Sequence, residues 1–127
     1  FSVDFRNLSQ EGLDRMDAAM HEDFARIAEA HGTQVEIRQV VKYEPCIFDA
    51  ACVASVRQAA LALELPHMDV VSGAGHDAVY VNGVAPAGMV FVPCKDGISH
   101  NEIEDALPEH LAAGANVLLL AMLERAG

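Results

Sequence analysis

The sequence predicts an α/β protein made of two pieces. Alternating apolar and polar residues indicate short strands with one buried face, whereas apolar residues spaced by three and four positions indicate amphipathic helices. The composition agrees, because 52% of the 127 residues are hydrophobic and only 6% are aromatic, which is typical of an aliphatic core in a mixed fold. Both patterns break between residues 44 and 48, so we place a boundary there.

The first piece is predicted to contain a strand, a long helix and a second strand. A period of two predicts the first strand over residues 1–6. Ser9 is a suitable N-cap for a helix that runs to about residue 30, and Gly32 is placed to end it. The alternation returns over residues 35–43 and predicts the second strand. The apolar stripe of the helix comprises Leu13, Met16, Met20, Phe24 and Ile27.

The second piece is predicted to alternate helices with buried strands. Asp49 can cap a helix over residues 50–64. Residues 68–71 and 89–92 are short apolar runs bounded by turn residues, which predict strands. A last helix follows over residues 105–124, and its many leucines and valines predict that it is well buried.

Charge and cysteine content restrict the partners and the compartment. The formal net charge is −11, from 19 acidic and 8 basic residues, which argues against a nucleic-acid partner and against an anionic membrane surface. No apolar run predicts a membrane span, and no leader predicts a signal peptide. Cys46, Cys52 and Cys94 form no Cys-x-x-Cys pair, so we expect reduced thiols in a cytoplasmic protein. Because residues 1–6 look like the middle of a strand, we expect a fragment of a longer polypeptide.

Two loops carry the residues best suited to chemistry. The loop Ser72–Ala78 follows a predicted strand and leads into a short helical or irregular piece, and its glycines let a ligand approach the backbone closely. His100 lies in the loop Gly97–Asn101, after the predicted strand at residues 89–92. If the sheet is parallel, both loops leave the same edge, which would make them neighbours in a cleft.

The residues alone leave a structural alternative open for each candidate. His76 and Asp77 are either a site pair or a turn histidine beside a capping aspartate, and His100 is either a ligand, an acid/base group or a loop residue. Arg6 could clamp a carboxylate bidentately, but a strand-end arginine is more often only solvated. Catalytic zinc takes about three protein ligands, so any further ligands of a metal at His100 lie outside this chain. The other histidines are expected at the surface or in interfaces: His21, His31, His67 and His110.

Three of these stretches, in this order and at this separation, resemble the C-terminal signature of a known family. They are Ser72-Gly-Ala-Gly-His-Asp-Ala78, Met89-Val-Phe-Val-Pro93 and Gly97-Ile-Ser-His-Asn-Glu102. The family is the hydantoinase/carbamoylase amidohydrolases, which include N-carbamoyl-L-amino-acid hydrolase, bacterial-type β-ureidopropionase and allantoate amidohydrolase. Residues 1–6 likewise resemble a strand of the family's dimerisation (lid) domain, and the resemblance covers the whole chain.

The resemblance implies a division into two partial domains. Residues 1–44 would be the C-terminal half of a ferredoxin-like dimerisation (lid) domain. Residues 45–127 would be the C-terminal part of a metallopeptidase-like α/β catalytic domain.

The resemblance also implies a role for four residues. His100 would be the last ligand to one ion of a two-metal site holding Zn²⁺ or Mn²⁺ in each full-length subunit. Arg6 would bind the carboxylate of a small-molecule substrate in the active site of the neighbouring subunit of a homodimer. Gly75 and His76 would line the substrate pocket.

The implied reaction is hydrolysis of the C–N bond of N-carbamoyl-L-amino acids or related ureido acids, which releases the amino acid, CO2 and ammonia. The family's other metal ligands and its general base lie upstream of the part that this chain matches, so we expect no catalytic residue here and no activity from the chain alone. An aminoacylase or dipeptidase is the alternative within the same class. From another class, the alternative is a non-catalytic α/β dimerisation module in which both loop histidines only hold their loops together.

Overall fold

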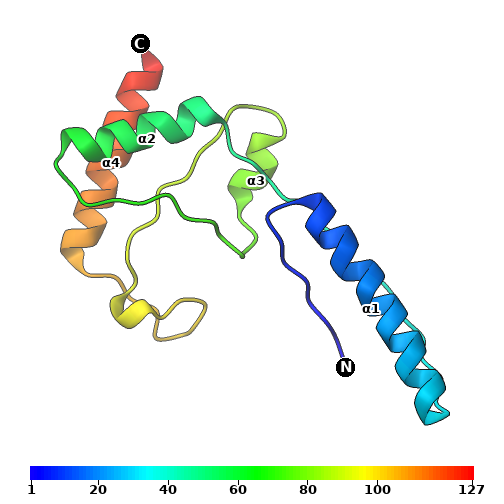
Figure 1. The fold of residues 1–127 in the computed structure, drawn as a ribbon. Helices are drawn as coiled ribbons and strands as arrows, with labels where there is room; N and C mark the ends of the chain where they lie inside the picture. The colour runs from blue at the N-terminus through cyan, green and yellow to red at the C-terminus, as the bar shows by residue number, and fades with distance from the viewer. The chain divides into compact units, whose positions relative to one another are not determined.

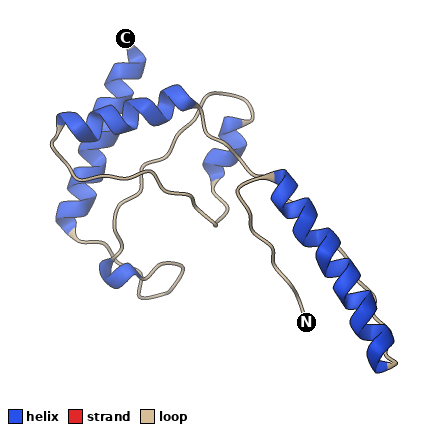
Figure 2. Ribbon diagram, viewed as in Figure 1, coloured by secondary structure: helices blue, strands red, loops and turns tan.

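The computed structural model describes residues 1–127, and all of its regular structure is helical (Figure 2). The helices are α1 (Gln10–His31), α2 (Ala50–Ala62), α3 (Asp77–Asn82) and α4 (Pro108–Ala126), and the short 3-10 turn η1 (Lys95–Gly97) precedes α4 (Figure 1). The chain divides into two compact units, Phe1–Cys46 and Ile47–Gly127. None of the helices combines the length and the apolar character that a membrane span requires.

The helix of the first unit begins and ends as the sequence predicts. Ser9 has an extended backbone, and its hydroxyl accepts a hydrogen bond from the Gly12 N–H at 3.1 Å. Gly32 follows the helix with φ 60° and ψ 30°, a left-handed conformation that glycine adopts without a steric penalty. The predicted N-cap and C-cap are therefore confirmed.

Contacts on both sides of α1 hold the irregular segments of the first unit against it. The ring of Phe1 packs edge-on against Phe24, with ring centroids 6.0 Å apart. After the helix, the ammonium of Lys42 lies 3.6 Å from the carboxylate of Asp14. Figure 1 shows the N-terminal segment running beside α1.

The second unit contains the other three helices, and α2 again begins at its predicted cap. The carboxylate of Asp49 accepts hydrogen bonds from the N–H groups of Ala51 and Cys52, at 3.0 and 2.9 Å. The helix ends at Ala62, earlier than predicted, because Glu64 takes a left-handed backbone with φ 54°. The last helix begins later than predicted, because Pro108 occupies its first turn, where proline is favoured.

The core of the second unit lies between α2 and α4. Ala59 and Ala60 of α2 are 5% exposed, and Val117 and Ala121 of α4 are 6% exposed. Small side chains at this contact let the two helices approach closely. The core is extended by three partly buried residues, Val56, Leu65 and Val90.

The structure contains none of the four predicted strands. The segments concerned are irregular: residues 1–6, 35–43, 68–71 and 89–92. A strand needs another backbone about 4.8 Å away with a ladder of hydrogen bonds, whereas alternation in a sequence reports only a buried face. Distant segments share single bonds instead, from the Asp49 N–H to the Ala87 carbonyl at 3.0 Å and from the Lys95 N–H to the Asp105 carbonyl at 2.7 Å. The predicted α/β class and the ferredoxin-like lid are therefore not seen in this chain.

Much apolar surface is exposed on both units. The accessible surface is 10143 Å², whereas a compact monomer of this length exposes about 6,600 Å². Even two units of these sizes, folded separately, would expose only about 7,900 Å². The exposed apolar side chains include Val40, Tyr43, Val71, Leu119 and Met122. The apolar faces of the chain are thus far larger than its own core.

Candidate functional site

The loop before α3 holds the imidazole of His76 in a defined position. His76 has an extended backbone, with φ −136° and ψ 145°, and immediately precedes α3. Its Nε2 atom lies 2.6 Å from the Oγ atom of Ser72, and the same Oγ accepts a hydrogen bond from the Ala74 N–H at 3.1 Å. The ring of Phe91 packs edge-on against the imidazole, with centroids 5.4 Å apart. The loop and the Phe91 segment together therefore fix the ring of His76.

Gly75 leaves the backbone beside His76 open. A Cβ atom built on Gly75 would meet no other atom within 4 Å, and the residue is exposed. The absence of a side chain is therefore not required by packing within this chain. It does allow another molecule to approach the peptide groups on either side of Gly75.

The second loop places His100 in an uncommon backbone conformation. His100 has φ 55°, and Asp96 and Gly97 nearby also have positive φ values of 56° and 70°. Non-glycine residues in this region carry a conformational cost and cluster at functional sites. The N–H of His100 donates to the carboxylate of Glu104, with its nitrogen 2.7 Å from Oε2, and the thiol of Cys94 lies 4.0 Å from the other carboxylate oxygen.

His100 suits a metal ion as one ligand of several. Its imidazole is exposed and forms no hydrogen bond within the chain, so both ring nitrogens are accessible. No group of three or more His, Cys, Asp or Glu residues in the chain lies close enough to hold a metal ion. This loop thus presents one candidate ligand and not a complete metal site, which takes about three protein ligands.

Arg6 lies in the first unit and forms an exposed ion pair. Both its Nε and its Nη2 atoms donate to one oxygen of Asp4, at 3.1 and 2.7 Å. This hydrogen bond, more than the charge alone, keeps the pKa of the Asp4 carboxyl below its usual range and raises that of the guanidinium. With side chains 64% and 66% exposed, the pair contributes little to stability and can be exchanged for another carboxylate.

The structure brings together only some of the predicted site residues. Gly75 and His76 share one loop, and His100 lies in the other loop of the same unit. The two histidines form no hydrogen bond or ring contact with each other. Arg6 belongs to the first unit, whereas the other three residues belong to the second.

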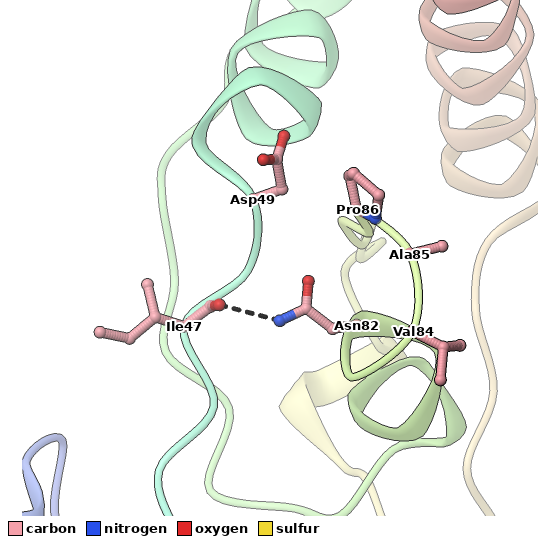
Figure 3. A pocket seen from close by; sticks show the side chains of 6 residues that line it. All are labelled: Ile47, Asp49, Asn82, Val84, Ala85 and Pro86. Carbon is pink, nitrogen blue, oxygen red and sulfur yellow. Dashed lines mark hydrogen bonds between the residues drawn. The ribbon is translucent and has the colours of Figure 1, made fainter.

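The second unit also has a surface hollow. None of the predicted site residues lines it. Figure 3 shows its lining: Ile47, Asp49, Asn82, Val84, Ala85 and Pro86. The amide of Asn82 donates to the Ile47 carbonyl at 2.9 Å and accepts from the Ala87 N–H at 3.3 Å. Asn82 is the last residue of α3, so its bond to Ile47 fastens the end of that helix to the segment that leads into α2.

Three contacts of the loop histidines were not predicted from the sequence. They involve Ser72, Phe91 and Glu104. Ser72 and Glu104 each lie four residues from a loop histidine. That spacing can be seen in the sequence, but whether two residues four positions apart make contact depends on how the backbone between them turns.

The chain is similar to known amidohydrolases over almost its whole length. Residues 6–124 match the peptidase family M20/M25/M40. An N-carbamoyl-L-amino-acid amidohydrolase of Rhizobium meliloti is 45% identical over 126 residues, which are 99% of this chain and 30% of that protein. A ureidoglycolate hydrolase of Oryza sativa is 29% identical over 94% of this chain and 25% of that protein.

The fold of the chain is also similar to that of a solved amidase structure. The crystal structure of an amidase of the hydantoinase/carbamoylase family from Burkholderia multivorans matches with a TM-score of 0.92 and 56% identity, over 95% of this chain and 29% of that chain. The chain spans about 30% of the length of the curated relatives it matches. It belongs to the peptidase family M20/M25/M40 and, within it, to the hydantoinase/carbamoylase amidohydrolases.

Proposed function

We propose that this chain is the C-terminal portion of a metal-dependent amidohydrolase that acts on N-carbamoyl-L-amino acids or closely related ureido acids. The observation that carries the proposal is the pair of loops with His76 and His100, in a chain 45% identical to an N-carbamoyl-L-amino-acid amidohydrolase. In one loop the imidazole is held by neighbouring side chains. In the other it is exposed and ready to bind a ligand.

The proposed reaction is hydrolysis of the carbamoyl group. One water molecule adds to the carbamoyl carbon, and the bond between that carbon and the amino-acid nitrogen breaks. The nitrogen leaves with a proton as the free amino acid, and the carbamic acid that remains decomposes to CO2 and ammonia. Two divalent metal ions, Zn²⁺ or Mn²⁺, would activate the water and stabilise the negative charge that develops on the carbonyl oxygen.

This chain would contribute to binding and positioning rather than to the proton transfers. His100 would hold one metal ion through a ring nitrogen, since its imidazole is exposed and makes no hydrogen bond in the chain. His76 would bind an oxygen of the substrate beside the open backbone at Gly75. The other metal ligands and the general base would come from the part of the full-length protein that precedes this chain.

Arg6 would recognise the substrate carboxylate, because guanidinium and carboxylate groups form strong bidentate pairs. We propose that it does so across a homodimer, in the active site of the neighbouring subunit. The extensive exposed apolar surface supports packing against further protein. We also propose a cytoplasmic location, as expected for a chain with three cysteines and no Cys-x-x-Cys pair.

The test is an assay of the full-length protein that contains this chain, after loading with Zn²⁺ or Mn²⁺. Ammonia release would be measured with N-carbamoyl-L-amino acids, their D-isomers, ureidoglycolate and allantoate, with N-acetyl amino acids and dipeptides in parallel. We expect the L-carbamoyl compounds to be hydrolysed fastest. Faster turnover of the acetylated or dipeptide substrates would instead assign an aminoacylase or dipeptidase.

Metal content provides a second measurement of the same proposal. The full-length protein should hold about two divalent ions per subunit, and His100→Ala should lose about one of them together with activity. His21→Ala is the matched control, because that histidine is exposed on α1 and lies 3.8 Å from Asp17. The chain of 127 residues alone should show no ammonia release above background; measurable turnover by it would contradict the proposal.

A further inference from the structure

We infer that Ser72 is a positioning residue that fixes the tautomer of His76, so that His76 offers a protonated Nδ1 to an oxygen of the substrate. This inference rests on the proposed function, because it assigns His76 to the substrate rather than to a metal. It begins from the short distance of 2.6 Å between Ser72 Oγ and His76 Nε2.

The hydrogen-bonding capacity of the Ser72 hydroxyl allows it to be the donor in that bond. A serine hydroxyl has one proton to donate and two lone pairs that accept. The Ala74 N–H occupies one lone pair at 3.1 Å, so the hydroxyl proton is not used in that bond and is available to Nε2. The 2.6 Å separation shows that the two side chains are in close hydrogen-bonding contact. In the arrangement that we infer, Ser72 donates this proton and Nε2 accepts it.

A neutral imidazole that accepts at Nε2 carries its proton on Nδ1. His76 then presents a hydrogen-bond donor on the side of the ring away from Ser72. Such a donor fits an oxygen that only accepts, such as a carboxylate or the carbonyl of a ureido group. It does not fit a metal ion, because a metal binds the unprotonated nitrogen and that atom is already engaged.

Two neighbours make this orientation specific. Phe91 packs against the imidazole at an angle of 66° between the ring planes, which restricts rotation of the ring. Gly75 leaves the adjacent backbone open to a ligand. The contrast with His100 is direct, since the imidazole of His100 forms no hydrogen bond in the chain and both of its nitrogens can bind a metal. The two loop histidines are thus prepared for different partners.

Nuclear magnetic resonance of the full-length protein labelled with ¹⁵N-histidine tests the tautomer directly. The signals of His76 are assigned by their loss in His76→Gln. We expect an unprotonated Nε2 and a protonated Nδ1 for His76 at a pH where the ring is neutral. In Ser72→Ala this preference should give way to a mixture of tautomers, and in Ser72→Thr, which keeps the hydroxyl, it should return. A protonated Nε2 in the unmodified protein would overturn the inference, as would a His76 tautomer that Ser72→Ala leaves unchanged.

Kinetics separates positioning from a merely structural role. Ser72→Ala should raise KM for an N-carbamoyl-L-amino acid by about fivefold to tenfold, as expected for the loss of one hydrogen bond, with a smaller change in kcat. Ser72→Thr should restore KM, and Ser2→Ala, an exposed serine in the other unit, should leave it unchanged. A fall in kcat alone, or a failure of Ser72→Thr to restore KM, would overturn the inference. If the tautomer behaves as expected but no ureido acid is hydrolysed, the role of Ser72 in fixing the ring stands and the proposed function fails.

Discussion

Glu104 fixes the backbone of His100 rather than its side chain. The N–H of His100 donates to the Glu104 carboxylate at 2.7 Å, in a residue whose φ of 55° is uncommon outside glycine but is adopted by histidine, asparagine and aspartate more often than by other residues. A charged acceptor makes this a strong type of hydrogen bond. The strained turn and its acceptor are four residues apart, so the loop stabilises its own conformation.

We predict that Glu104→Ala weakens metal binding at His100 without removing the ligand itself. The residue would lose the bond that holds its backbone in place, so its imidazole would be less well ordered. Supporting groups of this kind usually change metal affinity by about tenfold or more. Glu104→Gln has an amide oxygen that can still accept the hydrogen bond, so its metal affinity should lie between those of the unmodified protein and Glu104→Ala. Titration of the full-length apoprotein with Zn²⁺ measures the effect.

Glu102→Ala is the control for that experiment. Glu102 is an exposed acidic residue of the same loop, so its removal changes the local charge by the same amount. If both alanine variants weaken zinc binding equally, the effect is one of charge, and the specific role of Glu104 is wrong.

Arg6→Ala should mainly raise KM for substrates that carry a carboxylate. Loss of charged hydrogen bonds costs about tenfold to a hundredfold in binding, and Arg6→Lys should recover only part of it, because an ammonium cannot pair bidentately. Arg26→Ala is closely matched, since Arg26 pairs with Asp23 at 2.6 Å with a side chain 69% exposed. The measurement is KM from steady-state kinetics of Arg6→Ala, Arg6→Lys and Arg26→Ala. Equal KM values for Arg6→Ala and the unmodified protein would remove Arg6 from the site.

The helices could be predicted from the sequence because their signals are local. The Ser9 hydroxyl and the Gly32 backbone act within one turn of the helix that they cap, and Asp49 does the same for α2. Strands could not be predicted with the same success. A strand depends on a partner backbone that lies elsewhere, and the apolar alternation at residues 1–6 contains no information about whether that partner is present.

The candidate site was predictable only in part for a related reason. The motif around His76 and the loop with His100 could be recognised as sequence, and the family assignment followed from them. The roles of Ser72 and Glu104 could not, because each depends on backbone turns that bring a side chain back to a residue four positions away. The chain contains no group of three or more candidate ligands that could hold a metal ion, so the metal role of His100 stays a prediction.

The stability of α2 should depend on the ionisation of Asp49. The Cys52 N–H, above all, holds the pKa of the Asp49 carboxyl below its usual range. The folded pKa is thus lower than the unfolded value of about 3.9. Its stabilising contribution is therefore fully present above that value and is lost as pH falls through the folded pKa. Asp49→Asn should accordingly lower Tm at pH 7 and have a smaller effect at pH 3.

A second acidic residue of the same unit provides the comparison for Asp49. Glu124 lies in the last turn of α4, where the helix dipole disfavours a negative charge. Glu124→Gln should therefore leave Tm unchanged or raise it slightly at pH 7. A Tm loss for Asp49→Asn that is the same at pH 7 and pH 3 would show that the carboxylate charge does not contribute.

Gly114 should be a position where a better helix former destabilises the protein. Alanine is favoured over glycine inside a helix by about 1 kcal/mol, but a Cβ atom on Gly114 would overlap the side chain of Val92. Because valine is branched at Cβ, it cannot swing away freely, and overpacking of this kind costs about 1–3 kcal/mol. We expect Gly114→Ala to lower stability by about 1 kcal/mol overall.

Ala115→Gly, the opposite change at the exposed neighbouring position, should also lower stability, by about 1 kcal/mol. The double variant Gly114→Ala/Val92→Ala should be less destabilised than the sum of its single variants, because the second change removes the overlap. Denaturant unfolding of the full-length protein measures all four, and strict additivity in the double variant would show that Gly114 and Val92 do not meet.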